Sequence, residues 1–310
     1  MDVRNQTVIT EVVLLGFTQE RKINIVIFFL FLIIYLITII GNGLIICTIL
    51  LNSQLHIPMY FFLCNLSFID FCYSSTAVPR LLSDLFSIKR TISNLACGIQ
   101  LYIVVFMGGT ECQLLALMAY DRFVAICRPL HYRLLMKWSV CYGLTVFVWF
   151  FSFMINIVPS VATPLKLCYR NQINHFMCEV LGVTKLSCAD ISMNEFGIFC
   201  LTFVSLLLPF LLILFSYAYI ISSVIKIRST RQYKAFSTCT SHVVVVVLFF
   251  GTGMFTYFGP SSKFSPNQDK YVSVFYVIVC PMLNPLIYSL NNREIKKSVN
   301  KMFSKSIVYI

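Results

Sequence analysis

Apolar residues occur in seven long runs along the chain, separated by short polar segments. Each run reaches the roughly 20 residues that an α-helix needs to cross the hydrocarbon core of a bilayer. A helix satisfies its own backbone hydrogen bonds in lipid, so the pattern predicts an all-α fold, a seven-transmembrane helix bundle forming one domain over residues 1–310. The predicted helices cover residues 25–51, 58–80, 98–120, 139–160, 196–224, 240–260 and 271–290.

Two other membrane classes fit the pattern poorly. A β-barrel needs strands of alternating polarity, whereas Ile23–Leu51 and Val243–Phe250 are almost continuously apolar. The first run is also too long, and begins too late, for a cleaved signal peptide. Composition agrees with a membrane bundle, because only 12% of the residues are charged and soluble domains carry about 25%.

A short helix is expected after the seventh span. Residues 293–304 place Ile295, Val299, Met302 and Phe303 on one face and lysines on the other. Such a segment is typical of an amphipathic helix that lies on the membrane surface.

Charge and one glycosylation motif predict the orientation. Slightly more than half of the 24 Lys and Arg residues lie in the loops after the third and fifth helices and in the tail, which favours the cytoplasm for these segments. Asn5-Gln6-Thr7 is an N-glycosylation acceptor. We therefore expect residues 1–24 outside the cell and the tail 291–310 in the cytoplasm of a plasma-membrane protein. The net charge of +12 suits an anionic lipid bilayer and a protein partner rather than nucleic acid.

Four of the 13 cysteines fall on the predicted outer face. Oxidising conditions there favour two disulfides, and four cysteines allow three pairings. We favour Cys97–Cys178, which would hold the long loop across the mouth of the third helix, together with Cys168–Cys188.

Two acids, Asp70 and Glu111, fall near the middle of the predicted second and third helices. Two neighbouring carboxylates cannot both stay ionised cheaply in lipid. One alternative is a structural Na⁺ between them, in a polar cluster with Asn42, Ser67 and Asn284; the other is a protonated, hydrogen-bonded cluster without an ion.

Asp121 and Arg122 stand where the third apolar run meets a basic loop. A charged pair costs least at the water boundary, so it marks the cytoplasmic end of the helix. It could act as a latch between two states or serve only to orient the helix end.

Several sequence blocks, taken in order, resemble vertebrate olfactory receptors, which are rhodopsin-like class A G-protein-coupled receptors. The blocks are Val13–Thr18, Leu55–Leu63, Leu66–Asp70, Met118–Tyr132, His175–Cys178, Ser216–Tyr217, Lys234–His242 and Pro281–Tyr288. Phe250, Glu179 and Asn291 depart from residues common in the family.

The resemblance implies an odorant receptor of olfactory cilia that binds small volatile molecules in the outer half of the bundle. It also implies a stimulatory heterotrimeric G protein as partner, and an increase in cAMP. The expected ligand-binding residues are Val104, Val105, Gly108, Gly109, Thr202, Ser205, Gly253, Met254, Tyr257, Ser273, Tyr276 and Val277. The expected coupling residues are Asp121, Arg122, Tyr217, Lys234, His242, Asn284, Pro285 and Tyr288.

Two other function classes fit the sequence less well than a receptor. A transporter or channel would need charges along a path, and usually repeated halves, but only two acids lie in mid-membrane and no internal repeat is evident. A membrane enzyme would need a catalytic set, and the sequence offers no His-Glu-x-x-His motif. We therefore expect no enzyme activity and no cofactor other than the Na⁺ considered above.

Overall fold

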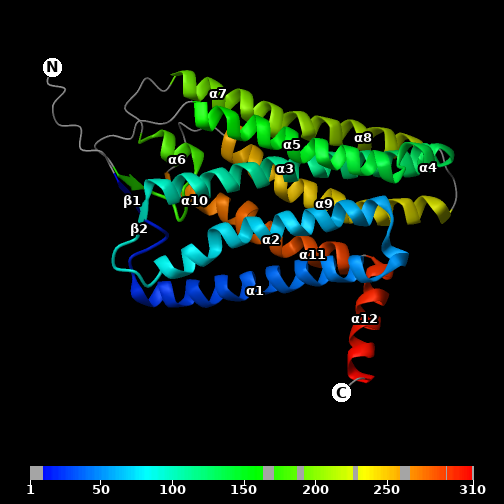
Figure 1. Cartoon of the computed structure of the whole chain (residues 1–310), viewed down its shortest axis with the longest axis horizontal. Helices are drawn as coiled ribbons and strands as arrows, with labels where there is room; N and C mark the ends of the chain where they lie inside the picture. The colour runs from blue at the N-terminus through cyan, green and yellow to red at the C-terminus, as the bar shows by residue number, and fades with distance from the viewer. Residues whose placement is uncertain are drawn as a thin grey trace.

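Long helices running side by side form the body of the molecule (Figure 1). The structure is a computed structural model that describes residues 10–162, 171–186, 192–225, 230–258, 266–290 and 292–308. In this part of the chain, seven helical spans are long and apolar enough to cross a membrane. The spans are α1 (Arg21–Leu51), α2 (Pro58–Asp84), α3 (Asn94–Cys127), α5 (Trp138–Ala162), α7 with α8 (Ser192–Ile225), α9 (Thr230–Phe258) and α10 with α11 (Pro266–Leu290). The predicted seven-helix fold is confirmed.

Several helices are longer than their apolar runs predict. Helix α3 continues to Cys127, so Asp121 and Arg122 lie inside its last turns rather than in a loop. Its other end is capped by Ser93, whose hydroxyl accepts a hydrogen bond of 3.2 Å from the Ala96 amide. Polar turns at helix ends cannot be read from hydropathy, because they extend beyond the hydrocarbon.

Two spans contain a π-helical turn that the apolar pattern did not predict. Phe203–Leu207 separates α7 (Ser192–Thr202) from α8 (Leu208–Ile225). Phe275–Val279 likewise separates α10 (Pro266–Val274) from α11 (Cys280–Leu290). A π-turn adds one residue to the helical repeat and so changes which side chains face inward.

One end of the bundle carries a small sheet, which the prediction of an all-helical chain missed. Strand β1 (Glu11–Leu14) lies in the centre, antiparallel to β2 (Thr91–Ser93) and parallel to β3 (Gln172–Ile173). The short helix α6 (Val180–Thr184) lies at the same end (Figure 1). We call this the sheet end. The strands have two to four residues, too few to leave a clear alternation in the sequence.

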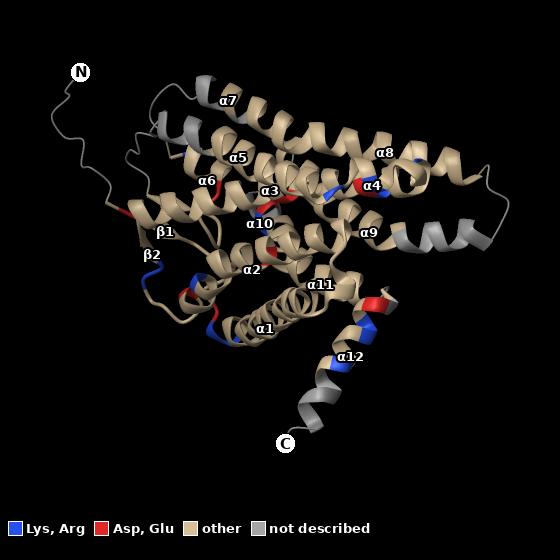
Figure 2. Ribbon diagram, turned by 45° about the vertical axis from the view of Figure 1, so that its right-hand side comes forward, with Lys and Arg blue, Asp and Glu red and all other residues tan. Residues whose placement is uncertain are grey.

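The opposite end carries the surface helix. Helix α12 (Arg293–Val308) runs away from the bundle axis (Figure 1), and several of its residues are Lys or Arg, coloured blue in Figure 2. Ile295 is buried against the bundle, and Asn292 caps the helix by accepting hydrogen bonds from the amides of Glu294 and Ile295. We call this the α12 end; the short helix α4 (Tyr132–Leu135) lies in the loop between α3 and α5.

The largest apolar core lies between α2, α3 and α9. Phe62, Leu114, Leu115 and Phe250 are fully buried in it. Many large apolar side chains of α1, α5 and α8 are exposed instead, as expected where lipid replaces water as the solvent. Cys112, Leu206 and Phe249 belong to this core and also line the cavity described below, so core packing positions part of the cavity wall.

Candidate functional site

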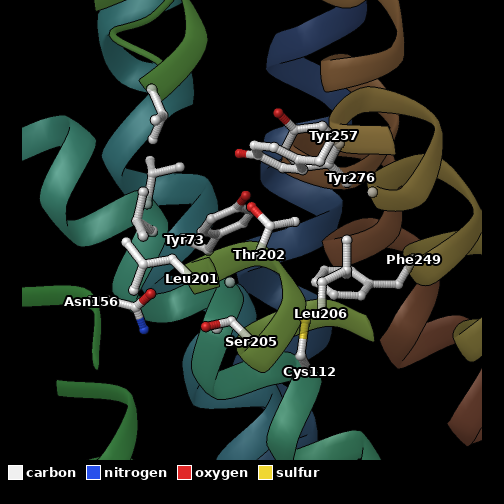
Figure 3. Close-up of a pocket in the computed structure, with 16 residues that line it drawn as sticks. Tyr73, Cys112, Asn156, Leu201, Thr202, Ser205, Leu206, Phe249, Tyr257 and Tyr276 are labelled. Carbon is white, nitrogen blue, oxygen red and sulfur yellow. The ribbon is translucent and has the colours of Figure 1, made fainter. Parts of the chain in front are cut away.

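A cavity of about 120 Å³ lies inside the bundle, between α3, α5, the α7–α8 span, α9 and the α10–α11 span. In Figure 3 the Tyr257 and Tyr276 rings lie at one end of this cavity, and Ser205 and Cys112 lie toward the other. None of the described residues that line it is Lys, Arg, Asp or Glu. The site can therefore enclose a small uncharged molecule but offers no counter-charge for an ion.

Ser205 is the most distinctive polar group of this cavity. Its side chain is only 9% exposed, and its hydroxyl has no hydrogen-bond partner in the described part of the chain. The residue belongs to the π-turn Phe203–Leu207. A buried hydroxyl without a partner costs stability, so a ligand that bonds to it would remove that cost.

Nine of the predicted ligand residues line the cavity, and the remaining three do not. Met254 packs against the apolar core, Val277 is buried in the second apolar cluster, and the Ser273 hydroxyl bonds to Tyr276 at 3.0 Å. Ser273 thus contacts a lining residue without lining the cavity itself. The nine that line the cavity are Val104, Val105, Gly108, Gly109, Thr202, Ser205, Gly253, Tyr257 and Tyr276.

The sequence analysis missed several lining residues. Leu206 follows Ser205 in the π-turn, and Val180 comes from the loop that crosses the bundle; neither position can be placed from helical spacing alone. Asn156 approaches α3 at Gly109, where a Cβ atom would lie 2.8 Å from the Asn156 amide nitrogen. The other missed lining residues are Tyr73, Cys112, Leu201 and Phe249.

The loop above the cavity is held by a disulfide. Cys97 and Cys178 are joined, with their Cα atoms 5.5 Å apart. The Cys178 amide also donates to Gln100 Oε1 at 2.9 Å. Cys168 and Cys188 lie outside the described residues, as does the glycosylation acceptor Asn5.

Two buried titratable groups lie in this loop. Burial, followed by the nearby Lys270 charge, lowers the pKa of His175 to about 3. Burial, followed by the charge of Asp269, raises the pKa of Glu179 to about 7. Their side chains approach to 3.8 Å, but the imidazole is neutral at neutral pH, so this contact is not an ion pair.

The α12 end holds the predicted latch residues. Arg122 Nη2 lies 3.8 Å from Asp121 Oδ2, and the Tyr132 hydroxyl donates a hydrogen bond of 2.8 Å to Asp121 Oδ1. Burial, followed by the Asp121 charge, raises the pKa of Tyr132, which keeps this phenol a hydrogen-bond donor. The Asp121 carboxylate thus interacts with both the Arg122 guanidinium and the Tyr132 hydroxyl.

A second tie joins three helices near this latch. His242 of α9 bonds through Nε2 to the Leu115 carbonyl of α3 at 3.1 Å. The carbonyl can only accept, so Nε2 carries the proton and Nδ1 accepts from the Tyr217 hydroxyl of α8 at 2.8 Å. Any outward movement of α9 must break this tie. Lys234 lies in α9, but its side chain is outside the described set.

The mid-membrane acids lie in the bundle interior. Asn284 donates to both carboxyl oxygens of Asp70, at 3.1 and 3.0 Å. Both oxygens of Glu111 are buried without a hydrogen-bond partner among the described residues. Asn42 donates hydrogen bonds to the Thr38 and Pro281 carbonyls instead of joining the acids.

Two further predicted coupling residues lie in α11. Pro285 packs against α1 at Gly41, and the buried Tyr288 hydroxyl has no partner in the described segments.

The fold defines a multi-pass membrane protein whose bundle contains an internal cavity with a mainly apolar lining. The sequence pattern of the family described as "Olfactory receptor" matches residues 31–306. The chain is 46% identical to mouse (Mus musculus) olfactory receptor 5AR1 over 98% of this chain and 99% of that protein. It is 43% identical to human (Homo sapiens) olfactory receptor 13C9, over 97% and 98%.

This chain therefore belongs to the olfactory receptor family. The sequence-based resemblance is confirmed. Because these relatives are receptors, the expectation that the chain is not an enzyme is confirmed as well.

Proposed function

We propose that this receptor binds small, uncharged, oxygen-bearing volatile molecules in the cavity and activates a stimulatory olfactory-type G protein, which raises cAMP. The single observation that carries the proposal is the cavity inside the bundle, whose described lining is uncharged and includes a Ser205 hydroxyl with no partner among the described residues. An apolar ligand surface would pack against Val104, Val105 and Leu206. One ligand oxygen would bond to Ser205, which matches the few placed polar groups typical of ligand sites.

Signalling would follow from a shift between two bundle geometries. In the geometry described here, Arg122 is next to Asp121, and α9 is tied to α3 and α8 through His242. A ligand that favours the other geometry would break the His242 tie, move the α12 end of α9 outward and free Arg122 for a G-protein helix. The ligand can shift this equilibrium only by the difference between its affinities for the two states.

The sheet end would face the outside of the cell and the α12 end the cytoplasm, in the plasma membrane of olfactory cilia. The Lys and Arg residues of α12, blue in Figure 2, support this orientation. Na⁺ would bind between Asp70 and Glu111, because hard cations prefer oxygen ligands and the Glu111 oxygens have no described protein partner.

The test is a cAMP reporter in cells screened with uncharged odorants, comparing the native receptor with Arg122→Ala at equal surface expression. We expect the odorant response of the variant to fall by more than about tenfold, because the freed cation is the proposed G-protein contact. Arg128→Ala, in the exposed segment after α3, is the matched control and should respond normally. An undiminished response of Arg122→Ala would refute the coupling role.

A further inference from the structure

Two adjacent glycines of α3 line the cavity, and they meet different surroundings. At Gly109 a side chain is excluded, because its Cβ would lie 2.8 Å from Asn156 Nδ2. At Gly108 there is room: the nearest described atom to an added Cβ is the Tyr73 hydroxyl oxygen, at 3.8 Å, which is an ordinary van der Waals contact. The packing of the described residues therefore requires Gly109 and does not require Gly108.

The backbone does not require a glycine at position 108 either. This position lies in the interior of α3, and its backbone has no positive φ. Ala forms helices more readily than Gly, because Gly loses more conformational freedom on folding. Gly108 therefore weakens the helix, and neither the described packing nor the backbone conformation accounts for it.

The missing side chain of Gly108 leaves room in the cavity. An added Cβ would approach only Tyr73 among the described residues, and Tyr73 lines the cavity as well (Figure 3). The added methyl group would therefore lie in the cavity, next to the Tyr73 hydroxyl. The cavity has a volume of only about 120 Å³, so the space of one methyl group changes what it can hold.

Gly253 of α9, a third glycine in the cavity wall, differs from Gly108. Its added Cβ would lie 3.2 Å from Leu206 Cδ1, and Leu206 belongs to the apolar core. A methyl group at Gly253 would thus push on the core. Among the three lining glycines, Gly108 is the one at which a methyl group takes cavity space without displacing a described neighbour.

We propose that Gly108 sets the upper size limit of the ligand, because the bare α3 backbone at this position receives the apolar end of the largest molecules that fit. This inference rests on the proposed function, in which the cavity is the ligand site. Gly108→Ala then weakens binding of the largest ligands and spares smaller members of the same chemical series. A pocket that is one methylene too small or too large discriminates by roughly 10- to 200-fold.

The native Cys112 thiol reports this space without a known odorant. Cys112 is free, buried and lines the cavity, and it lies on the same face of α3 as Gly108, one turn away. Alkyl methanethiosulfonates form a mixed disulfide with a thiol and release methanesulfinic acid, so the alkyl group stays beside Cys112. The full-length receptor in nanodiscs would be treated with the methyl or the hexyl reagent, and modification of Cys112 followed over time by peptide mass spectrometry.

We expect Gly108→Ala to slow the hexyl reaction at Cys112 by about tenfold or more and to keep the methyl reaction within a factor of about two of the native rate. The variant should unfold at the native temperature or higher, because Ala favours the helix. Gly98→Ala is the matched control: it makes the same substitution in α3 at an exposed glycine with no described neighbour within 4 Å of its Cβ. It should leave both reactions unchanged.

Three results would overturn the size limit. One is a hexyl rate in Gly108→Ala within a factor of about two of the native rate. Another is equal slowing with both reagents, which would mean that access to Cys112 had changed rather than the room beside Gly108. The last is a native Cys112 that even the methyl reagent leaves unmodified while the exposed Cys200 reacts, because no molecule then enters the cavity.

None of these measurements uses an odorant or cAMP. A selective loss of the hexyl reaction would support the size limit even if no odorant raised cAMP, so the size limit and the proposed function can fail separately.

Discussion

Ser205 shows how much can depend on one hydroxyl. It is buried in a cavity that otherwise offers mainly apolar surface, and it lacks a partner among the described residues. Helical spacing could predict that Ser205 faces inward. It could not predict that the hydroxyl would be left without a partner, because that depends on the neighbouring helices and on the π-turn that contains it.

Ser205→Ala should separate recognition from folding. We expect the potency of oxygen-bearing agonists to fall about five- to tenfold, the value of one hydrogen bond, while potency of matched hydrocarbon analogues is kept. Thermal stability should be unchanged or higher, because an unsatisfied buried group is removed. Dose–response curves and thermal unfolding measure the two effects. Ser222→Ala, exposed on α8, is the control; equal loss for both ligand classes would argue against the anchor.

The proposed binding of Na⁺ also depends on a single residue, Glu111. Replacing choline chloride by sodium chloride should raise the unfolding temperature of the native receptor by about 2–4 °C. Glu111→Gln should abolish that difference, since it removes a charged ligand oxygen. Glu294→Gln changes an exposed acid and should preserve it. A native receptor with no sodium dependence would favour the protonated cluster that the sequence left open.

At the scale of elements, the sequence predicted the helices well and their interruptions poorly. The apolar runs identified all seven spans, because bilayer thickness imposes a minimum length that hydropathy detects directly. The π-turns Phe203–Leu207 and Phe275–Val279 contain mostly apolar residues, like the helices around them, so composition does not mark them. Strand β1 was hidden for a different reason, since its partners β2 and β3 are distant in sequence.

The loop segment between β3 and α6 should make stability depend on pH through Glu179. Folding raises its pKa from 4.5 to about 7, so the folded loop binds the proton more tightly than the unfolded chain. This contribution is complete below about pH 4.5 and is lost as pH rises through 7. The contribution of His175 to stability has the opposite pH dependence, because folding lowers its pKa. This contribution is lost as pH falls below 6.5 toward 3.

Glu179→Gln isolates the acid, because the His175 contribution cancels between the native receptor and the variant. We expect the variant to be more stable at pH 8 by about 3 kcal/mol, and the gain to shrink toward zero near pH 4.5. Unfolding followed by intrinsic fluorescence across this range is the measurement. Glu20→Gln, exposed at the same end, should show no such trend, and a pH-independent gain would contradict the assignment.

At the scale of the whole molecule, seven candidate spans are expected to place the two ends of the chain on opposite sides of the membrane. The sheet end and the α12 end lie at opposite ends of the bundle (Figure 1). An epitope tag before residue 10 should react with antibody on intact cells, and a tag after residue 308 only after permeabilisation. Tags that are both accessible on intact cells would contradict the proposed orientation.

The central position of β1 has a consequence for biosynthesis. This strand is made first, but β3 is translated only after α1, α2, α3 and α5. The strand can pair with β2 once α2 has been made, but its edge toward β3 must stay unpaired while four helices enter the bilayer. A nascent chain halted before Gln172 should leave it open to proteases, whereas a chain released beyond Cys178 should protect it.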